Sequence, residues 1–258
     1  MASSSNIQES GRGQVNSISL VVATFNEASN LPELVDGLCA AFARTGIAGE
    51  IIVVDDNSPD GTGRVADNLA ARYPLHVVHR PRKMGLASAV VDGFAVAKGD
   101  LLGVIDADLS HPPSLVPEMV RAIVERGADL AVASRHVPGG GVKDWPKSRE
   151  YISAFANLLA RPCTGIHDAT SGFFLMRRSM VEGVAVNPIG FKIGLEFYVK
   201  GRYRRYEEVP YVFTDRRHGK SKFTWREVVN YLRQLVSLMG YRLGRWWTRW
   251  RGASPARL

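Results

Sequence analysis

Two aspartates one residue apart, Asp106 and Asp108, close the apolar run of GVIDADLSHPP at residues 103–113. Paired carboxylates of this kind bind Mg²⁺ or Mn²⁺, because hard cations prefer oxygen ligands. A bound cation would neutralise the two like charges and bridge them to a diphosphate, which carboxylates alone would repel. A single Asp-x-Asp is more often an ordinary acidic loop, so the surrounding sequence has to decide between the two interpretations.

Polar residues also end other apolar runs in the first half of the chain. These ends are Asn26-Glu27 after ISLVVATF (18–25), Asp55-Asp56 in EIIVVDD (50–56) and Arg135 in DLAVASR (129–135). Segments with helical spacing separate the runs, which predicts strand–helix–strand units in a mostly parallel sheet. Such sheets bind ligands beyond the carboxyl ends of their strands, so these side chains are predicted to share one site. No glycine-rich turn follows the first strand, which argues against a dinucleotide-binding dehydrogenase.

The order of the elements places these strand ends. Five β-branched runs predict strands at residues 18–25, 50–56, 75–80, 100–108 and 129–135. Their apolar residues face both sides, as in buried parallel strands. After residue 136 the regular alternation ends, and we predict helices near 148–160 and 190–200 with strands at 171–178 and 207–213. The sequence therefore predicts an α/β fold with a mostly parallel central sheet.

Composition and charge describe a folded chain with a basic end. Of its 258 residues, 45% are hydrophobic and 22% are charged, which is typical of globular proteins. Residues 1–199 contain 18 Lys/Arg and 21 Asp/Glu, whereas residues 200–258 contain 15 and 4. This asymmetry predicts an anionic partner at one end of the protein. Cys39 and Cys163 lack metal-binding spacing, which fits a reducing compartment.

The C-terminal segment predicts one long amphipathic helix. Residues 224–251 read TWREVVNYLRQLVSLMGYRLGRWWTRWR, with apolar residues at three- and four-residue steps and six arginines around them. The tryptophans and arginines favour a helix that lies in the interface of an anionic membrane. The alternative is a helix that packs on its own domain. A nucleic-acid partner is not predicted, because no recognition module accompanies the basic tail.

These segments divide the chain into four predicted parts: a disordered lead-in at 1–16, a globular domain at 17–222, the interface helix at 223–251 and a flexible tail at 252–258. No stretch approaches the ~18 apolar residues that span a bilayer, and the N-terminus has no signal-peptide core. The sequence therefore predicts a cytoplasmic protein that is peripheral on the cytoplasmic face of a membrane.

Several motifs, in order along residues 18–222, resemble the family-2 glycosyltransferases, and within them the dolichol-phosphate (polyprenol-phosphate) mannose synthases. The motifs are VVATFNEASNLPELV, EIIVVDDNSPDGT, KMGLASAVVDGFAVAKGD, DADLSHPP, SGFF, GFKIGLE and HGKSK. The resemblance implies a nucleotide-binding fold of the GT-A type and Mg²⁺ or Mn²⁺ as cofactor. It also implies an inverting transfer of a hexose, usually mannose from GDP-mannose, to a polyprenyl or dolichyl monophosphate.

Matching these motifs residue by residue implies three groups of site residues. The donor would be bound by Ala23, Phe25, Glu27, Val54, Asp56, Asp106, Ala107, Asp108, Lys192, Arg216 and Lys222. The metal ligands would be Asp106, Asp108 and Ser110, and the acceptor phosphate would be bound by Arg135, Arg149 and Ser153. The implied catalytic residues among these are Asp108, Arg135 and Arg149.

Three positions depart from the family pattern. Many relatives have a tyrosine where Phe25 stands and a glutamine where Ser110 stands. An arginine that is common after Ser153 in relatives is Ala154 here, which thins the positive charge around the acceptor. These differences leave the nucleotide base and the third metal ligand open.

A phosphate acceptor also fits the residues independently of the resemblance. A sugar hydroxyl needs a general base to remove its proton, whereas a phosphomonoester is mostly dianionic at neutral pH. It needs only cations that hold it in line with the sugar. The loop RHVPGGGVKDWPKSR supplies such cations in Arg135, Lys143, Lys147 and Arg149. Glu196 is the candidate base for a hydroxyl acceptor, and pairing with a lysine is its alternative role.

Other functions stay open at this point. A related family-2 transferase would use UDP-glucose or a soluble sugar acceptor, and a non-catalytic protein would keep only the membrane surface. A separate membrane-anchoring protein is a further candidate partner, because relatives often carry transmembrane helices in the C-terminal region and this chain has none.

Overall fold

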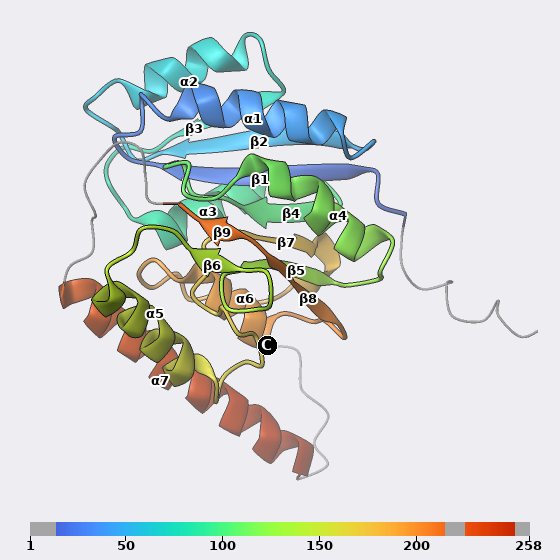
Figure 1. Ribbon diagram of the computed structural model, residues 1–258, viewed down its shortest axis with the longest axis vertical. Coiled ribbons are helices and arrows are strands. Elements are labelled where there is room, and N and C mark those ends of the chain that lie inside the picture. The colour runs from blue at the N-terminus through green and yellow to red at the C-terminus, as the bar shows by residue number, and fades with distance from the viewer. Residues whose placement is uncertain (1–13, 215–224, 251–258) are drawn as a thin grey trace, which may run out of the picture.

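A computed structural model describes residues 14–214 and 225–250 of the chain, with side chains up to residue 247. Its centre is a seven-stranded sheet in the order β3-β2-β1-β4-β7-β5-β8 (Figure 1). The strands are β1 (Ser17–Thr24), β2 (Ala48–Asp55), β3 (Leu75–His79), β4 (Leu101–Val104), β5 (Leu130–Ser134), β7 (Phe174–Arg177) and β8 (Tyr206–Pro210). Two short strands, β6 (Gly141–Val142) and β9 (Val212–Phe213), pair with each other.

Helices cover both faces of this sheet. They are α1 (Leu31–Ala43), α2 (Thr62–Ala70), α3 (Leu86–Val96), α4 (Val116–Val124), α5 (Lys147–Ala160), α6 (Ile193–Lys200) and α7 (Trp225–Trp250), with 3₁₀ turns at Pro113–Leu115 and Arg178–Met180. Successive residues of β1 face opposite sides of the sheet, because side chains alternate along a strand. They therefore belong to two different apolar cores. Leu20 joins the core under α1, α2 and α4, and Val21 joins the core under α3 and α6.

The strand β7 runs against its neighbours. It pairs antiparallel with β4 and with β5, whereas the other strand pairs described in the sheet are parallel. Phe174, its first residue, pairs with Val104, the last residue of β4. The loop before β7 therefore arrives at the carboxyl ends of β4 and β5, where the site residues were predicted.

The predicted strands are confirmed, with differences at two ends. The strand predicted at 100–108 stops at Val104, because the chain turns away from the sheet and leaves the two aspartates beyond its edge. The strand predicted at 207–213 is divided into β8 and β9. Pro210 ends β8, since proline has no N–H to continue a ladder of hydrogen bonds.

The tail helix α7 shows features of both predicted roles. Leu235 and Leu238 are buried in an apolar cluster with residues of α5 and α6. The Tyr231 hydroxyl donates to the Ala156 carbonyl of α5 at 2.6 Å, and Figure 1 shows the two helices side by side. Trp225 and other apolar residues on the outer face are exposed. No helix within the described ranges has the length and apolarity to cross a bilayer. The predicted domain boundaries stay predictions.

Candidate active site

The carboxyl ends of β2, β1 and β4 lie side by side, because these strands are parallel neighbours in the sheet. Thr24 at the end of β1 pairs with Asp55 at the end of β2. From β1 the strand order proceeds outward in both directions, to β2 and β3 on one side and to β4 on the other. Open α/β sheets bind ligands in the crevice at such a reversal point. Asp106 and Asp108 follow β4 directly and therefore stand at this crevice.

The segment after β4 forms a tight turn around Asp108. Ser110 donates two hydrogen bonds to Asp108 Oδ1, from its backbone N–H at 3.1 Å and from its hydroxyl at 2.5 Å. Leu109 between them has a φ of 61°, a left-handed conformation that costs a residue with a side chain about 1 kcal/mol. Asn26 and Asn57, which follow β1 and β2, also have positive φ. Three of the four non-glycine residues with positive φ in the described part of the chain thus lie just beyond β1, β2 and β4, and the fourth, Asp144, lies before α5. Such conformations are common at functional sites.

The Asp106 carboxylate is oriented by His111. The two side chains approach to 3.3 Å between Nε2 and Oδ2. The His111 ring is buried among Phe173, Tyr211 and Phe213, whose ring centroids lie between 5.2 and 5.7 Å away. Its Nδ1 has no hydrogen-bond partner within the described part of the chain. Nε2 is therefore the ring nitrogen that contacts a polar group, the Asp106 carboxylate.

Arg135, which follows β5, is held by a buried ion pair. Its Nε and Nη2 donate to the two carboxylate oxygens of Asp168, each at 2.7 Å. Nη2 also donates to Thr170 Oγ1 at 3.1 Å. Burial alone would lower the pKa of Arg135, but hydrogen bonds and charge from Asp168 raise it. The guanidinium is therefore rigid and charged, and its Nη1 takes no part in these bonds.

Lys192, immediately before α6, lies beside this pair. Its Nζ donates to the Thr170 carbonyl at 2.7 Å. Burial, and then the positive charge of Arg135, lowers the pKa of Lys192, against the opposing effects of Asp106 and Asp168. Asp106 also acts on the pKa of Arg135. Thr170 therefore contacts both cations, through its hydroxyl and its carbonyl, and the charge of Asp106 acts on the pKa of each.

Arg149, in the first turn of α5, packs against two aromatic rings that Arg135 also contacts. Its Cζ lies 3.9 Å from the ring centroid of Trp145 and 5.9 Å from that of Phe213. Arg135 Cζ lies 5.5 Å and 5.6 Å from the same two centroids. The two predicted acceptor arginines therefore share one aromatic pair, whose cation–π attraction offsets the repulsion between their charges.

The third predicted acceptor residue lies on α5 as well. Ser153 stands one turn after Arg149, and its carbonyl accepts a hydrogen bond from Asn157 Nδ2 at 3.1 Å. Asn157 Oδ1 in turn accepts from the Thr170 N–H at 3.1 Å. Since Thr170 also contacts Arg135, one loop ties this face of α5 to the end of β5.

The predicted donor residues lie at the ends of β1 and β2, which are adjacent strands. Ala23 pairs with Val54 in the register of the sheet. Phe25 follows β1, and its ring centroid lies 4.0 Å from Lys83 Nζ. Glu27 Oε2 accepts a hydrogen bond from the Asn30 side chain at 2.8 Å. An aromatic face, a cation and backbone atoms therefore border the crevice next to β4.

Asp56, which was also predicted to bind the sugar donor, forms hydrogen bonds with other residues of the protein. It accepts a hydrogen bond from Arg80 Nη1 at 2.7 Å and from the Gly85 N–H at 2.9 Å. These bonds hold the loop after β3 against the end of β2. The predicted contact between Asp56 and the nucleotide stays a prediction.

The segment that carries most of these strand ends matches a known family. Residues 19–184, more than half of the chain, match the profile described as "Glycosyl transferase family 2". The chain belongs to glycosyl transferase family 2. Its motifs were identified with this family from the sequence, and that prediction is confirmed.

Named relatives of this family-2 glycosyltransferase are 37–43% identical to it. "Dolichol-phosphate mannosyltransferase" of Pyrococcus furiosus is 43% identical over 226 residues, which cover 86% of this chain and 63% of the relative. The chain thus spans less than two thirds of that protein. The enzyme of the same name from Saccharomyces cerevisiae is 37% identical, with 88% of each chain covered. "Polyprenol monophosphomannose synthase" of Mycolicibacterium smegmatis is 39% identical, with 80% of each covered.

Solved structures confirm the fold class. Glucosyl-3-phosphoglycerate synthase from Mycobacterium tuberculosis superposes with a TM-score of 0.62 at 20% identity, covering 89% of this chain and 80% of the other. Mannosyl-3-phosphoglycerate synthase from Rubrobacter xylanophilus gives 0.59 at 20% identity, covering 95% and 77%. The family-2 chain therefore has the predicted GT-A-type α/β fold.

The residues after β4 fit a cation that is shared with a substrate. The described residues contain no group of three or more His, Cys, Asp or Glu side chains that would hold a metal by itself. Mg²⁺ commonly takes one or two carboxylates and completes its coordination with substrate phosphates and water. Asp106 and Asp108 form such a pair, and the Ser110 hydroxyl is bonded to Asp108. The three predicted metal ligands are therefore compatible with a cation, and their binding of it stays a prediction.

A methyl group at Gly172 is expected to disturb this carboxylate pair. A β-carbon at that position would lie 2.5 Å from Asp106 Oδ2, which real structures do not tolerate. Gly172→Ala should therefore displace Asp106 and weaken Mn²⁺ binding about tenfold to a hundredfold, as measured by titration with the nucleoside diphosphate present. Gly141→Ala is the matched control, because a β-carbon there meets nothing within 4 Å. Equal Mn²⁺ affinity in the two variants would contradict the assigned role of Gly172.

Two groups of site residues remain: those that the structure does not describe and those that the sequence analysis did not assign. Arg216 and Lys222, predicted to face the donor phosphates, lie outside the described residues. The residues that sequence reasoning did not assign are Arg80, Lys83, Trp145, Asp168, Thr170 and Gly172. Gly172 belongs to the SGFF motif and Trp145 to the basic loop, so both were within quoted segments. Lys83 likewise opens the quoted motif KMGLASAVVDGFAVAKGD. No local pattern marks Asp168, because its partner Arg135 lies far away along the chain.

Proposed function

We propose that this chain transfers mannose from GDP-mannose to a polyprenyl or dolichyl monophosphate, with inversion at the sugar carbon and with Mg²⁺ or Mn²⁺ bound. Relatives at 37–43% identity carry the names dolichol-phosphate mannosyltransferase and polyprenol monophosphomannose synthase. One structure of the M. tuberculosis fold neighbour contains Mn²⁺, UDP and glucosyl-3-phosphoglycerate. That complex supports a nucleotide and a metal in this kind of fold.

The observation that carries the proposal is the placement of Arg135 and Arg149 against the same two rings, Trp145 and Phe213. Two guanidinium groups on one aromatic pair favour an anion that both contact, and paired N–H groups suit a phosphate. Arg135 follows β5 and Asp106 follows β4, and both of these strands flank β7, so this phosphate would lie on the same side of the sheet as the predicted donor diphosphate.

A hydroxyl acceptor is less well supported, because the candidate base is buried and paired with a lysine. Glu196 is fully buried. Its Oε2 lies 2.6 Å from Lys200 Nζ and accepts from the Asn187 N–H at 3.0 Å. This agrees with the alternative role given to Glu196, pairing with a lysine. A phosphate acceptor needs no such base, since it arrives without the proton.

In the proposed reaction, an oxygen of the acceptor phosphate attacks the anomeric carbon of the sugar. The bond from that carbon to the donor diphosphate breaks, and the nucleoside diphosphate leaves with the electron pair. Arg135, Arg149 and Ser153 would hold the acceptor in line, and no proton has to move. Lys192 would offset the negative charge that develops on the leaving group. A single displacement of this kind inverts the configuration of the sugar.

The donor is proposed to bind along the ends of β1, β2 and β4. Its contacts would be Ala23, Phe25, Glu27, Val54, Asp56 and Ala107, with Arg216 and Lys222 on the phosphates. A cation held by Asp106, Asp108 and Ser110 would, when bound, offset the charge of the diphosphate.

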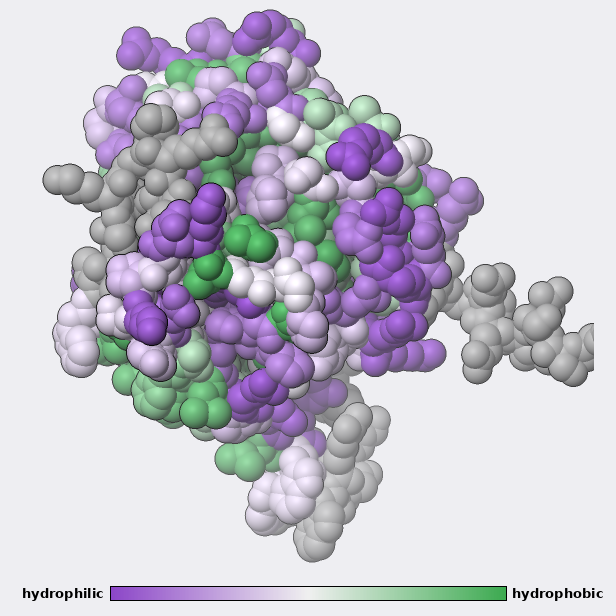
Figure 2. All heavy atoms as spheres, viewed as in Figure 1, coloured by the Kyte–Doolittle hydropathy of each residue, from purple (hydrophilic) through white to green (hydrophobic). Residues whose placement is uncertain are grey.

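The outer face of α5 supports a membrane as the source of the acceptor. Tyr151, Ile152, Phe155 and Leu158 are 72%, 60%, 60% and 63% exposed, and Figure 2 shows hydrophobic residues gathered over this helix. Exposed apolar patches on one face mark interaction sites. Arg149 begins the same helix, so a lipid whose phosphate it holds would extend its chain along this surface.

We therefore propose that α5 and α7 together lie on the cytoplasmic face of a membrane with anionic lipid. Their exposed apolar residues would enter the interface while Arg226 and Arg233, which are exposed on α7, contact head groups. In this arrangement residues 17–222 form the catalytic domain and residues 223–251 the interface helix. A separate anchoring protein stays a candidate partner.

Charges on the α5 face are expected to release the protein from lipid. Ile152→Glu combined with Phe155→Glu should weaken binding to phosphatidylcholine–phosphatidylglycerol vesicles about tenfold or more, because each exposed apolar side chain contributes on the order of 1–2 kcal/mol when buried. Vesicle sedimentation measures this. Val96→Glu with Val124→Glu is the control, since both valines are exposed on α3 and α4. If both double variants bind as the parent does, α5 does not contact the membrane.

The proposed activity is tested by following a labelled sugar. Purified protein with Mn²⁺ or Mg²⁺ and a short polyprenyl phosphate is given labelled GDP-mannose or labelled UDP-glucose in turn. Label from GDP-mannose is expected in the lipid phase. Label from UDP-glucose alone would identify the other donor, and exclusively water-soluble product would show that the acceptor is a soluble sugar. No transfer from either donor would favour a non-catalytic membrane-surface protein.

A further inference from the structure

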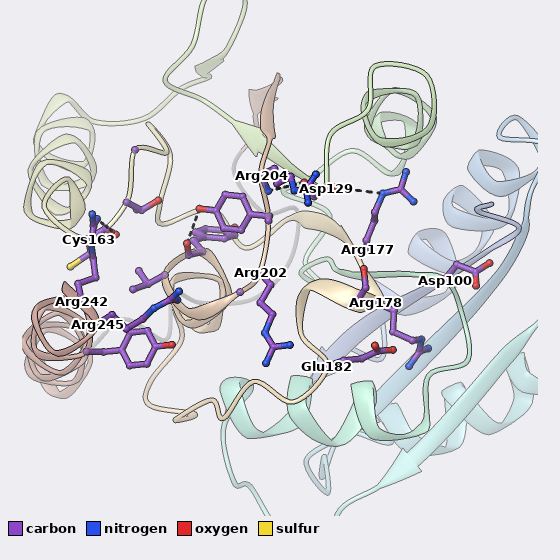
Figure 3. Close-up of a pocket in the computed structure, with 18 of the residues that line it drawn as sticks. Asp100, Asp129, Cys163, Arg177, Arg178, Glu182, Arg202, Arg204, Arg242 and Arg245 are labelled. Atoms are coloured by element: carbon purple, nitrogen blue, oxygen red, sulfur yellow. Dashed lines mark hydrogen bonds and ion pairs between the residues drawn. The ribbon is translucent and has the colours of Figure 1, made fainter. Parts of the chain in front are cut away.

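A second hollow lies at the opposite ends of the central strands from the candidate active site, where β4 and β5 begin. It is a cleft of about 1500 Å³ (Figure 3). Asp100 and Asp129, which immediately precede β4 and β5, line it together with Arg177 at the end of the antiparallel β7. The loop after α6 and the C-terminal half of α7 form the other walls. The cleft contains none of the residues predicted to bind donor, metal or acceptor, so it is a separate site.

Positive charge dominates this cleft. Six arginines line it, Arg177, Arg178, Arg202, Arg204, Arg242 and Arg245, against three carboxylates, Asp100, Asp129 and Glu182. Two of the carboxylates are engaged by the backbone. Asp100 Oδ2 accepts from two N–H groups at 2.9 and 3.1 Å, and Asp129 Oδ2 from two others at 2.8 and 3.1 Å. Asp129 Oδ1 also lies 3.9 Å from Arg177 Nε. Three carboxylates cannot neutralise six arginines, so the cleft keeps an excess of positive charge.

The arginines of the cleft differ in how far the fold engages their side chains. Arg178 donates from Nε to the Gly99 carbonyl and from Nη2 to the Ala97 carbonyl, each at 2.8 Å. Arg242 Nη1 donates to the Cys163 carbonyl at 2.6 Å, near the end of α5. The exposed Arg202 side chain, in contrast, has no hydrogen bond or ion pair with any described residue. The fold therefore does not account for this guanidinium.

The inward face of α7 changes character where the cleft begins. Leu235 and Leu238 are buried against the domain. Arg242 and Arg245 follow on the same face of the helix, because residues three, four and seven apart share a face. Figure 3 shows Arg202 and Arg245 extending into the cleft from its two walls. A helix that packed along its whole length would carry apolar residues at these positions instead.

We propose that this cleft is a second anion site, in which Arg202 and Arg245 bind a phosphate group. Guanidinium groups bind phosphate through paired hydrogen bonds, and a bound anion would offset the excess positive charge of the cleft. The cleft is larger than a phosphate ion, and Tyr203, Tyr241 and Trp246 line it. The ligand is therefore a phosphate that carries a further group, either the head group of an anionic phospholipid or a soluble phosphomonoester.

The test compares two variants of the full chain that lose the same charge. Arg202→Gln with Arg245→Gln removes the proposed contacts. Arg44→Gln with Arg205→Gln is the control, because both arginines are exposed and neither lines the cleft. Binding of glycerol phosphate is measured by calorimetry, and flotation is measured with phosphatidylcholine vesicles with and without phosphatidic acid. Phosphate bound at Arg135 contributes equally to both variants.

The cleft variant is expected to bind about tenfold to a hundredfold more weakly than the control in one of the two assays. Loss with phosphatidic acid vesicles identifies a lipid head group, and loss with glycerol phosphate identifies a soluble ligand. Equal binding by both variants in both assays overturns the proposal. Sugar transfer measured in detergent should continue in the cleft variant, so the result does not depend on the proposed function.

Discussion

Replacing Asp108 by asparagine is expected to slow sugar transfer by about a hundredfold to a thousandfold. The amide oxygen of asparagine still accepts the hydrogen bonds that Ser110 donates to Oδ1, so the turn after β4 should keep its shape. The substitution removes the negative charge that would hold a cation against the donor diphosphate. The measurement is kcat/KM for the labelled donor together with the midpoint of thermal unfolding.

Asp67→Asn provides the matched control for this substitution. Asp67 is an exposed aspartate that pairs with His79 on the surface, so its variant should transfer sugar at the parental rate. If Asp108→Asn is as active as Asp67→Asn, the carboxylate pair after β4 does not hold the metal. If it is inactive because it unfolds, its thermal midpoint will have fallen as well.

Replacing Asp168 by asparagine is expected to lower the free energy of unfolding by about 3–5 kcal/mol. Asp168 is fully buried and its two oxygens accept from Nε and Nη2 of Arg135. The variant would leave the buried guanidinium without its counter-charge. Urea unfolding followed by circular dichroism measures the loss.

The pair can also be replaced as a unit. Arg135→Leu with Asp168→Leu leaves no unpaired charge and should recover much of the lost stability while remaining inactive. A single Asp168→Asn variant as stable as the parent would show that the ion pair contributes nothing to folding.

The decrease in the free energy of unfolding at acid pH should also depend on Asp168. Burial would raise the pKa of Asp168, but hydrogen bonds and charge from Arg135 lower it below the value of 3.8 of a free aspartate. Its contribution is therefore complete above about pH 3.8 and is lost as the pH falls through the lower folded-state pKa. The Asp168→Asn variant lacks this part of the acid transition. An identical acid dependence of unfolding in parent and variant would contradict the assignment.

Much of the site was predictable because its residues stand next to recognisable strands. β-branched runs marked β1, β2, β4 and β5, and the polar residues after each run lie where parallel strands present ligands. The partners of these residues were not predictable. Arg135 and Asp168 are 33 positions apart, and they meet because β7 enters the sheet antiparallel beside β5. No periodicity in the sequence predicts that β7 runs antiparallel to β4 and β5.

The C-terminal helix shows a different limit of sequence reasoning. Apolar residues at helical spacing predicted α7, but they occur on more than one face of it. Whether a given leucine packs on the domain or faces outward depends on what lies beside the helix. Leu235 is buried and Leu232 is 45% exposed, and their positions in the sequence do not distinguish them.

The late position of β7 and β8 in the sequence has a consequence for how the chain folds during its synthesis. Both neighbours of β5 in the sheet, β7 and β8, follow it in the sequence. As the chain leaves the ribosome, β5 has no partner strand, and β4 presents an open edge, until residues 174–210 have emerged. Unpaired edges of this kind invite association between chains. A nascent chain halted near residue 165 is therefore a natural client for chaperones, and fragments that end there should aggregate.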